Sequence, residues 1–263
     1  MIPGILAGQI SAPGAGPPPS PGAFVLTAET GAFALIGQDA GMAVTVAAPS
    51  GGWTFSTSKT NTGPGASSIT FTGYAIGAAA AGRVVVAAIA WSHSVSSTLT
   101  GVTIGGVAAT AVQTVTAHST SGRIALYYAV VPSGTTADVA ITISAGISSG
   151  IACHVWYGFP ATSTPLDSGS ATATGGGIVT VSDLQIVAGG ILIAFAGGSN
   201  SSDPWSFGWN GTDTLVDQGH GTTNLTGWSV RHALTTVATT TNDLTSDPSG
   251  TSPTALIGAT WGA

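Results

Sequence analysis

The sequence predicts an all-β protein whose main part, residues 52–263, is an antiparallel β-sandwich, most simply of the jelly-roll type. Two observations lead to this prediction. Short segments that are apolar throughout, or that alternate apolar and polar residues, recur along the chain between turns of Gly, Ser, Thr and Pro. No segment combines apolar residues at helical spacing with helix caps, so we expect no helix longer than about three turns.

Residues 83–91 and 124–131 are apolar on both faces, which is typical of central strands that are buried on both sides. Residues 138–144 alternate, so that Val139, Ile141 and Ile143 are expected to face a core. Further strands are expected at residues 151–158, 178–188, 190–196, 205–209, 227–235 and 254–261. Many short strands joined by such turns are typical of a sandwich.

A hairpin is the clearest local prediction. Gly105 and Gly106 separate the apolar residues 102–104 from residues 107–109. Two consecutive glycines supply the positive φ angles that a two-residue hairpin turn needs. The chain should therefore reverse direction at this dipeptide.

The composition favours a protein that assembles with other subunits. Charged residues make up only 5% of the chain, and Gly accounts for 39 of 263 residues. Charged residues are depleted from the cores of protein interfaces because burying them costs desolvation energy. A surface of Ser, Thr, Ala and Gly therefore suits extensive contact with neighbouring subunits, although an extracellular β-protein with a Ser/Thr-rich surface would share this composition.

Nucleic acid is not an expected partner. The chain has four basic residues, Lys59, Arg83, Arg123 and Arg231, and a formal net charge of -6. Binding to a nucleic-acid backbone needs several Lys or Arg residues gathered on one surface. Four scattered cations do not supply them.

Residues 1–22 predict an extended anchoring arm. They are rich in Pro, Gly, Ala and Ser, so they cannot bury a core of their own. Their large apolar residues lie near the start, at Ile2, Ile5, Leu6 and Ile10. A cluster of apolar anchors followed by a stiff Pro-rich spacer is what a tether to a different subunit or protein requires.

Residues 23–51 contain a short repeat. Two segments that begin Ala-Phe-x-Leu follow one another at residues 23–31 and 32–41, and each ends in Gly. In each, Phe and Leu are two positions apart and would share one face of a strand. Val44 and Val46 suggest a third strand, and three short strands need a further surface to cover their apolar face.

No targeting or membrane segment is expected. Residues 1–10 contain no Lys or Arg, unlike the first part of a signal peptide. The longest apolar run, residues 186–198, is too short and too rich in Gly to span a bilayer. Cys153 is the only cysteine, so no disulfide within the chain is expected.

Several of these segments resemble bacteriophage proteins. The opening Met1-Ile2-Pro3-Gly4-Ile5 and residues 33–40 (FALIGQDA) resemble the G-x-F-x-L-T-G-Q-type repeats of phage structural proteins from alphaproteobacterial hosts, with Ile36 where Thr is usual. Residues 101–109 (GVTIGGVAA) resemble hairpins of phage appendage and adhesin-like β-domains. The resemblance implies a virion or tail-associated β-sandwich protein.

The sequence does not match the common catalytic motifs, so the protein is not expected to be an enzyme. No G-x-S-x-G motif is present, and Cys153 and His154 are strand neighbours that should face opposite sides. The five histidines lack metal-ligand spacing, so no metal or other cofactor is expected. Asp203, Asp213 and Asp217 lie in one loop-rich stretch and are expected to form turns, although a pair of them could serve a glycosidase.

One aromatic group suggests a binding surface. Trp205, Phe207 and Trp209 alternate along one predicted strand and would share one face, which Trp228 could extend from the next strand. Exposed aromatic rings can stack on sugar rings, whereas rings of this kind in a core serve packing. Both alternatives stay open from the sequence.

Together these features predict a structural component of a phage virion, a tail appendage or capsid decoration made in the host cytoplasm. The arm would bind other virion proteins or copies of the same chain, with a trimer as a simple arrangement. The two alternatives are a glycan-binding module of the tail that recognises the host surface, and a polysaccharide-degrading enzyme. Neither nucleic acid nor membrane insertion is expected.

Overall fold

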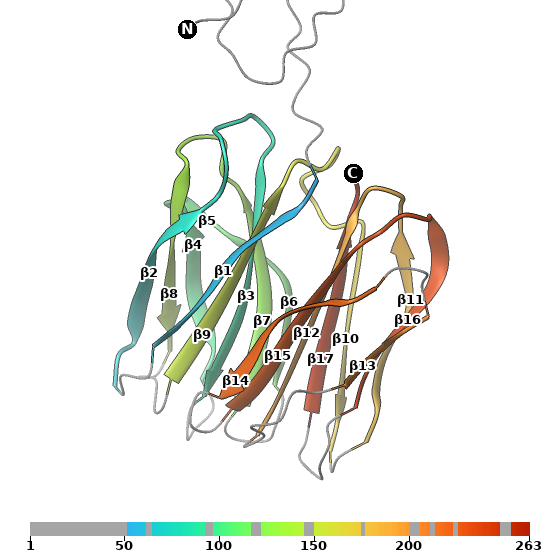
Figure 1. Ribbon diagram of the computed structural model, residues 1–263. Helices are drawn as coiled ribbons and strands as arrows, with labels where there is room; N and C mark the ends of the chain where they lie inside the picture. The colour runs from blue at the N-terminus through green and yellow to red at the C-terminus, as the bar shows by residue number, and fades with distance from the viewer. Residues whose placement is uncertain are drawn as a thin grey trace, which may run out of the picture. The chain divides into compact units, whose positions relative to one another are not determined.

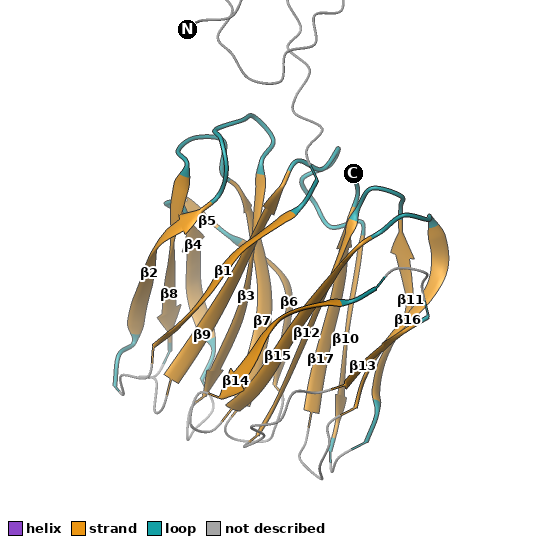
Figure 2. Cartoon of the chain, viewed as in Figure 1, coloured by secondary structure: helices purple, strands orange, loops and turns teal. Residues whose placement is uncertain are grey.

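The computed structural model describes residues 52–61, 65–92, 97–116, 122–144, 150–174, 177–199, 206–210, 214–222, 226–247 and 254–263. All of them belong to one compact unit, Val46–Ala263. Among these residues the chain forms strands joined by loops and turns, without a helix, and every pair of neighbouring strands is antiparallel (Figure 2). The predicted all-β fold class is confirmed.

The strands form four sheets, which we name A to D. Sheet A has the order β1-β9-β3-β7-β6 and sheet B the order β2-β8-β4-β5. The strands of these two sheets are β1 (Thr54–Asn61), β2 (Ser68–Ala75), β3 (Val84–Ser92), β4 (Leu99–Ile104), β5 (Val107–Ala108), β6 (Thr110–Thr116), β7 (Gly122–Val130), β8 (Thr136–Ile143) and β9 (Gly150–Gly158).

Sheets C and D contain the rest of the chain. Sheet C has the order β10-β17-β12-β15-β14 and sheet D the order β11-β16-β13. Their strands are β10 (Asp167–Ala173), β11 (Val179–Ile186), β12 (Ile191–Ser199), β13 (Ser206–Trp209), β14 (Val216–Thr222), β15 (Thr226–Leu234), β16 (Thr239–Asp247) and β17 (Thr254–Trp261).

The second half of the chain repeats the topology of the first. The order of sheet C becomes that of sheet A when β10, β17, β12, β15 and β14 are read as β1, β9, β3, β7 and β6, and sheet D matches sheet B without β5. In each half, two sheets with these interleaved strand orders form a jelly roll. The region that the sequence predicted to be one sandwich is therefore two sandwiches in tandem: a first sandwich of sheets A and B, and a second of sheets C and D.

Local geometry supports the repeat at the level of single residues. Gly73 in β2 and Asp183 in β11 have positive φ angles of 71° and 60°, and each sits at a bulge where the register shifts. Their backbone N–H groups donate to Oδ1 of Asp138 in β8 (2.8 Å) and of Asp243 in β16 (3.2 Å). Both halves thus use the same bulge and the same carboxylate acceptor on the neighbouring strand.

Three hydrophobic cores stack in a row, in the sheet order B, A, C, D (Figure 1). The alternation of side chains along β3 shows how this arises, because Val85, Ala87 and Ile89 face sheet B while Val84 and Val86 face sheet C. The side chains of β12 likewise point alternately toward sheet A and toward sheet D. The central strands of sheets A and C, among them β3 and β7, have apolar side chains on both faces, which accounts for the apolar runs at residues 84–91 and 124–131; Arg83, the first residue of the predicted segment, precedes β3.

The described part of the chain begins and ends at one end of the sandwich pair. Trp53, just before β1, packs on Trp261 of β17 with ring centres 5.6 Å apart, and its Nε1–H donates to the carbonyl of Gly262 (3.4 Å). We call this the proximal end (Figure 1). Strands β1, β3, β6, β8, β10, β12, β14 and β16 run away from this end and finish at the opposite, distal end.

The predicted hairpin is present. Gly105 and Gly106 have φ angles of 59° and 79°, and they join β4 to β5 as a two-residue turn. The arm (1–22) lies outside the described residues, as does almost all of the repeat segment (23–51). Their predicted strands and anchors therefore stay predictions.

Candidate functional site

The pair Cys153 and His154 does not form a catalytic site. Cys153 lies in the core between sheets A and B, where burial raises the pKa of its thiol to about 12. His154 points to the other side of β9, toward sheet C, and its ring centre lies 4.3 Å from that of Trp228. Burial lowers the pKa of His154 to about 3, so it is neutral at physiological pH.

Carboxylates within the described residues serve the fold. The carboxylate of Asp167 accepts hydrogen bonds from the backbone N–H groups of Ser168 (2.7 Å) and Gln185 (2.9 Å), which ties β10 to β11. Among the described residues, no three His, Cys, Asp or Glu side chains gather as metal ligands. Asp203 and Asp213, and the side chain of Asp217, lie outside the described part of the structure.

The described members of the aromatic group face inward. Phe207 and Trp209 alternate with exposed residues along β13, and both are half-buried against the core between sheets C and D. The Arg231 guanidinium lies 5.3 Å from the centre of the Phe207 ring. Trp228 does not extend this face, because it belongs to sheet C and packs in the core between the two sandwiches. Trp205 lies outside the described residues.

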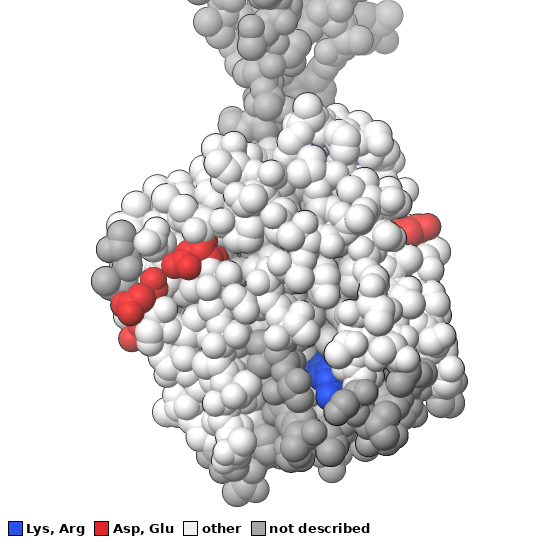
Figure 3. Space-filling model, turned by 180° about the vertical axis from the view of Figure 1, so that it is seen from behind, with Lys and Arg blue, Asp and Glu red and all other residues white. Residues whose placement is uncertain are grey.

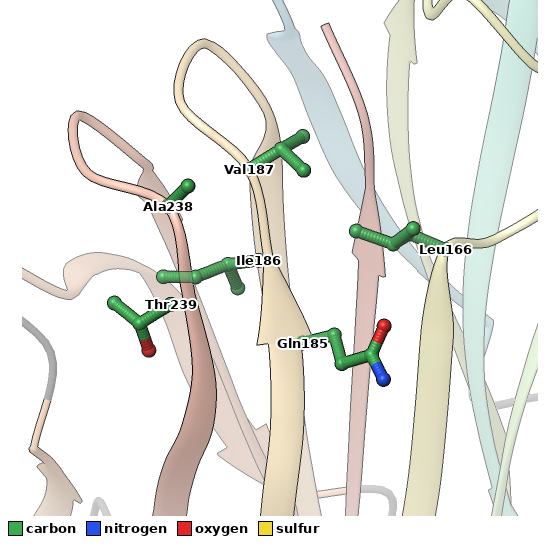
Figure 4. A pocket seen from close by; sticks show the side chains of 6 residues that line it. All are labelled: Leu166, Gln185, Ile186, Val187, Ala238 and Thr239. Atoms are coloured by element: carbon green, nitrogen blue, oxygen red, sulfur yellow. The ribbon is translucent and has the colours of Figure 1, made fainter.

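A small pocket lies at the proximal end of the second sandwich. Its volume is about 350 Å³, and it lies where β11 ends and β16 begins, beside the start of β10 (Figure 4). Its lining contains no charged residue; it consists of Leu166, Gln185, Ile186, Val187, Ala238 and Thr239. A small, mostly aliphatic pocket of this kind suits one or two apolar side chains.

In the first sandwich an arginine secures the corresponding place. Arg83 precedes β3 and is fully buried, and each of its five guanidinium N–H groups donates to a backbone carbonyl. The acceptors, at 2.6–3.1 Å, belong to the segments that follow β2 and β7: Gly77, Ala78, Val131, Ser133 and Gly134. The guanidinium therefore ties the two turns together, and all five of its N–H donors are used.

The second sandwich has a glycine at that position. Gly190 precedes β12 as Arg83 precedes β3, and its carbonyl accepts from the N–H of Thr235 (2.9 Å) as that of Arg83 accepts from Val131 (2.9 Å). A side chain cannot be built at Gly190, because a Cβ would lie 2.2 Å from the carbonyl oxygen of Trp261. Here the Thr235 hydroxyl donates to the Val187 carbonyl, and the backbone N–H of Gly189 donates to the Thr235 carbonyl (2.7 Å). The pocket lies beside these two turns.

Exposed apolar side chains surround the same end of the second sandwich. Leu166, Leu234 and Val237 are 40%, 49% and 49% exposed, and Val216 at the start of β14 is 47% exposed. In the described part of the first sandwich, Val107 (39%) is the one large apolar residue with comparable exposure. The exposed large apolar side chains of the described residues lie mainly on the second sandwich, and the most exposed of them, Ile178 (63%), precedes β11 at the opposite end from the pocket.

The described surface carries few charges. In the view of Figure 3, acidic atoms gather in one area and at one further place, and basic atoms are visible at one place, while most of the described surface is uncharged. No helix among the described residues is long and apolar enough to cross a membrane. Comparison with protein families, with curated proteins and with solved structures found no match to this chain.

The pocket could not be predicted from the sequence, since its lining residues are ordinary strand-end residues. One sequence feature does mark the difference between the two sandwiches: Ala-Gly-Arg precedes the apolar run at residue 84, and Ala-Gly-Gly precedes the one at residue 191. Both glycines of these motifs, Gly82 and Gly189, have positive φ angles, of 77° and 81°. Aligning the two motifs places Arg83 opposite Gly190.

Proposed function

We propose that this chain is a structural component of a bacteriophage virion, anchored through its N-terminal segment and displaying the paired jelly rolls on the particle. The observation that carries the proposal is the contact between Trp53 and Trp261, with ring centres 5.6 Å apart. Because Trp53 lies against Trp261 and Gly262 at the proximal end, the segment before it joins the sandwich pair there, and attachment through that segment would leave the distal end facing outward.

Surface chemistry agrees with this proposal. The exposed positions of sheet B are mainly Ser, Thr, Gly and Ala, as in β2, where Ser68, Thr70, Thr72, Gly73 and Ala75 are exposed. Such a surface can pack closely against neighbours without burying unpaired charges. The interior positions are filled with apolar side chains from four sheets, which gives a stable body.

The composition of the sequence that follows the distal strand ends fits a displayed surface. It is rich in Ser, Thr, Gly and Asn, as in residues 93–98 (HSVSST) and 200–205 (NSSDPW). Loops of such composition supply adaptable hydrogen bonding in other binding proteins. A role in recognising the host surface would be carried by this end.

The test is to look for the chain in particles. Mass spectrometry of density-purified virions, released from cells that encode this chain, should detect it in the particle band together with the capsid and tail proteins. Antibodies raised against the purified chain should then label intact particles in electron micrographs. A chain that is abundant in the lysed cells but absent from the purified particles would refute the proposal.

A further inference from the structure

The two buried arginines of the first sandwich differ in how their guanidinium groups are bonded. Arg83, at the proximal end, is fully enclosed and donates all five N–H groups to backbone carbonyls. Arg123 is the second residue of β7, which begins at the distal end, and is 6% exposed. Its Nη1 is buried without a hydrogen-bond partner, and no other described residue forms a hydrogen bond or an ion pair with its guanidinium. Arg83 thus serves the fold, whereas the donors of Arg123 are unused.

The first sandwich has no free carboxylate to pair with Arg123. Asp138 is the only Asp or Glu between residues 52 and 158, and its Oδ1 already accepts the N–H of Gly73 (2.8 Å). Asp138 is also the third residue of β8, which starts at the proximal end, away from Arg123. Burial of an unpaired cation is unfavourable, and it lowers the pKa of Arg123.

The jelly-roll topology does not require an arginine at this position. Arg123, second in β7, pairs with Trp91, eighth in β3. At the same places in β15 and β12 of the second sandwich, Gly227 pairs with Gly198. The second jelly roll is therefore built without this cation, and Arg123 is a local addition to the first.

The surroundings of Arg123 favour a strong interaction with an anion. Ala125, two residues along β7, and the paired Trp91 both belong to the core between sheets A and B, so Arg123 points toward the distal edge of that core. The Trp91 Nε1–H is bonded to Ser97 Oγ (3.1 Å), and both side chains are fully buried. A charge pair beside such a wall is screened less than one in open water.

The distribution of charge along the chain also favours an anion at this sandwich. Residues 52–158 contain three basic residues and one acidic residue, whereas residues 159–263 contain one basic residue and seven acidic ones. The first sandwich is therefore the positive half of a chain whose formal net charge is -6. An anion that approaches the pair of sandwiches is attracted to the first and repelled by the second.

We propose that Arg123 binds the carboxylate of an acidic saccharide, such as a uronic acid, at the distal end of the first sandwich. The planar guanidinium can donate two parallel N–H groups to a carboxylate, and its single positive charge matches that of one carboxyl group. This inference rests on the proposed function, which turns the distal end outward, toward the host surface. It names the class of ligand that the displayed end would bind.

Calorimetric titration of the full-length chain with trigalacturonate at low ionic strength tests it, with the neutral trisaccharide of galactose as the matched ligand. We expect saturable binding of the uronate only. Arg123→Met should weaken this binding at least about tenfold. Lys59→Gln, which removes one positive charge elsewhere in the same sandwich, should leave the affinity unchanged, because the effect belongs to Arg123 and not to net charge.

Stability measurements separate binding from a structural role. Without ligand, Arg123→Met should melt no lower than the native protein, since replacing an unpaired buried charge by an apolar side chain of similar size is neutral or stabilising. The uronate should raise the melting temperature of the native protein but not that of Arg123→Met. Arg123→Lys, which keeps the charge but lacks the planar fork, should fold and bind the uronate more weakly than the native protein.

Three results would overturn the proposal. The first is a native protein that shows no saturable binding of the uronate. The second is a strong loss of stability in Arg123→Met together with unchanged uronate affinity in Arg123→Lys, because the arginine would then serve the fold. The third is a triglutamate peptide or inorganic phosphate that binds as tightly as the uronate, because the site would then not recognise an acidic saccharide.

The outcome is separable from that of the proposed function. If the chain is found in purified particles but the uronate does not bind, the inference about Arg123 is wrong and the proposed function stands. If the uronate binds through Arg123 but the chain is absent from particles, the saccharide site stands and the virion role is wrong.

Discussion

At the scale of single residues, His154 is the most unusual side chain in the core between the two sandwiches. It is fully buried, its Nδ1 lies 2.6 Å from Ser58 Oγ, and its Nε2 has no hydrogen-bond partner in the structure. Rings of Phe195 and Trp228 from sheet C pack against it. A second proton on the ring, which would make it a cation, would place an unpaired charge between two hydrophobic sheets.

This position makes stability sensitive to acid. Because burial lowers the pKa of His154 from 6.5 to about 3, the folded protein binds fewer protons than the unfolded chain between these values. The contribution of His154 to the free energy of unfolding is complete above about pH 6.5 and is lost as the pH falls toward 3, by at most about 1.4 kcal/mol per pH unit.

Urea denaturation between pH 7 and pH 4 measures this effect. We expect the free energy of unfolding of the native protein to fall across that range, and His154→Gln, which cannot titrate, to flatten the dependence. At pH 7 the variant should be the less stable of the two, since the substitution disturbs a close-packed site. If the two proteins show the same slope against pH, His154 does not carry the acid sensitivity.

At the scale of elements, the two halves close their proximal ends by different means. Arg83 links two turns of the first sandwich through five side-chain hydrogen bonds, whereas in the second the Thr235 hydroxyl donates to the Val187 carbonyl and the Gly189 N–H donates to the Thr235 carbonyl. Removing the guanidinium would leave several backbone carbonyls without a donor, and a buried unsatisfied group costs about 1–3 kcal/mol.

We therefore expect Arg83→Met to lower the free energy of unfolding by about 3 kcal/mol. Arg83→Lys should fall between Met and the native residue, because an ammonium keeps the charge but has three donors and no planar fork. Chemical denaturation followed by tryptophan fluorescence checks both. Equal stability of Arg83→Met and the native protein would show that water replaces the guanidinium without cost.

The strands that the sequence predicted are those with an apolar signal. Residues 83–91 became β3, and residues 138–144 became β8 with Val139, Ile141 and Ile143 buried as expected. Strands such as β10 (DSGSATA) and β16 (TTTNDLTSD) were not predicted. Their residues are mostly small or polar, and they are strands because neighbouring strands pair with them: β16 pairs with β11 and β13, and the edge strand β10 pairs with β17.

At the scale of the whole molecule, the tandem repeat could not be predicted from residue patterns. The counterpart strands β3 (VVVAAIAWS) and β12 (ILIAFAGGS) share an apolar character but few identical residues. The repeat becomes visible through strand order and through the bulges at Gly73 and Asp183. For the candidate site, the sequence indicated which segment would anchor the chain but not the pocket, because a pocket depends on how distant turns meet.

The shared core predicts that the two sandwiches unfold together. Side chains of sheets A and C interdigitate there, including Trp156 from the first half and Phe195 from the second. Separating the sandwiches would expose this apolar surface to water. We expect a single calorimetric transition, and Phe195→Ala should shift the whole transition by the 3–5 kcal/mol typical of such a change.

Two transitions, of which Phe195→Ala moves only one, would show that the sandwiches are independent domains. A substitution in the outer core of the first sandwich, Ile141→Val, is the matched control. It should destabilise the same single transition, by about 1 kcal/mol.

The central claim is that the N-terminal segment anchors a folded pair of jelly rolls to a virion. The most direct measurement is the copy number per particle of a chain that lacks residues 1–22, compared with the full-length chain, in phage that carry only one of the two. We predict that the shortened chain keeps a β-sheet circular dichroism spectrum and the stability of the full-length chain, but is nearly absent from purified particles. Normal occupancy of the particles by the shortened chain would contradict the account.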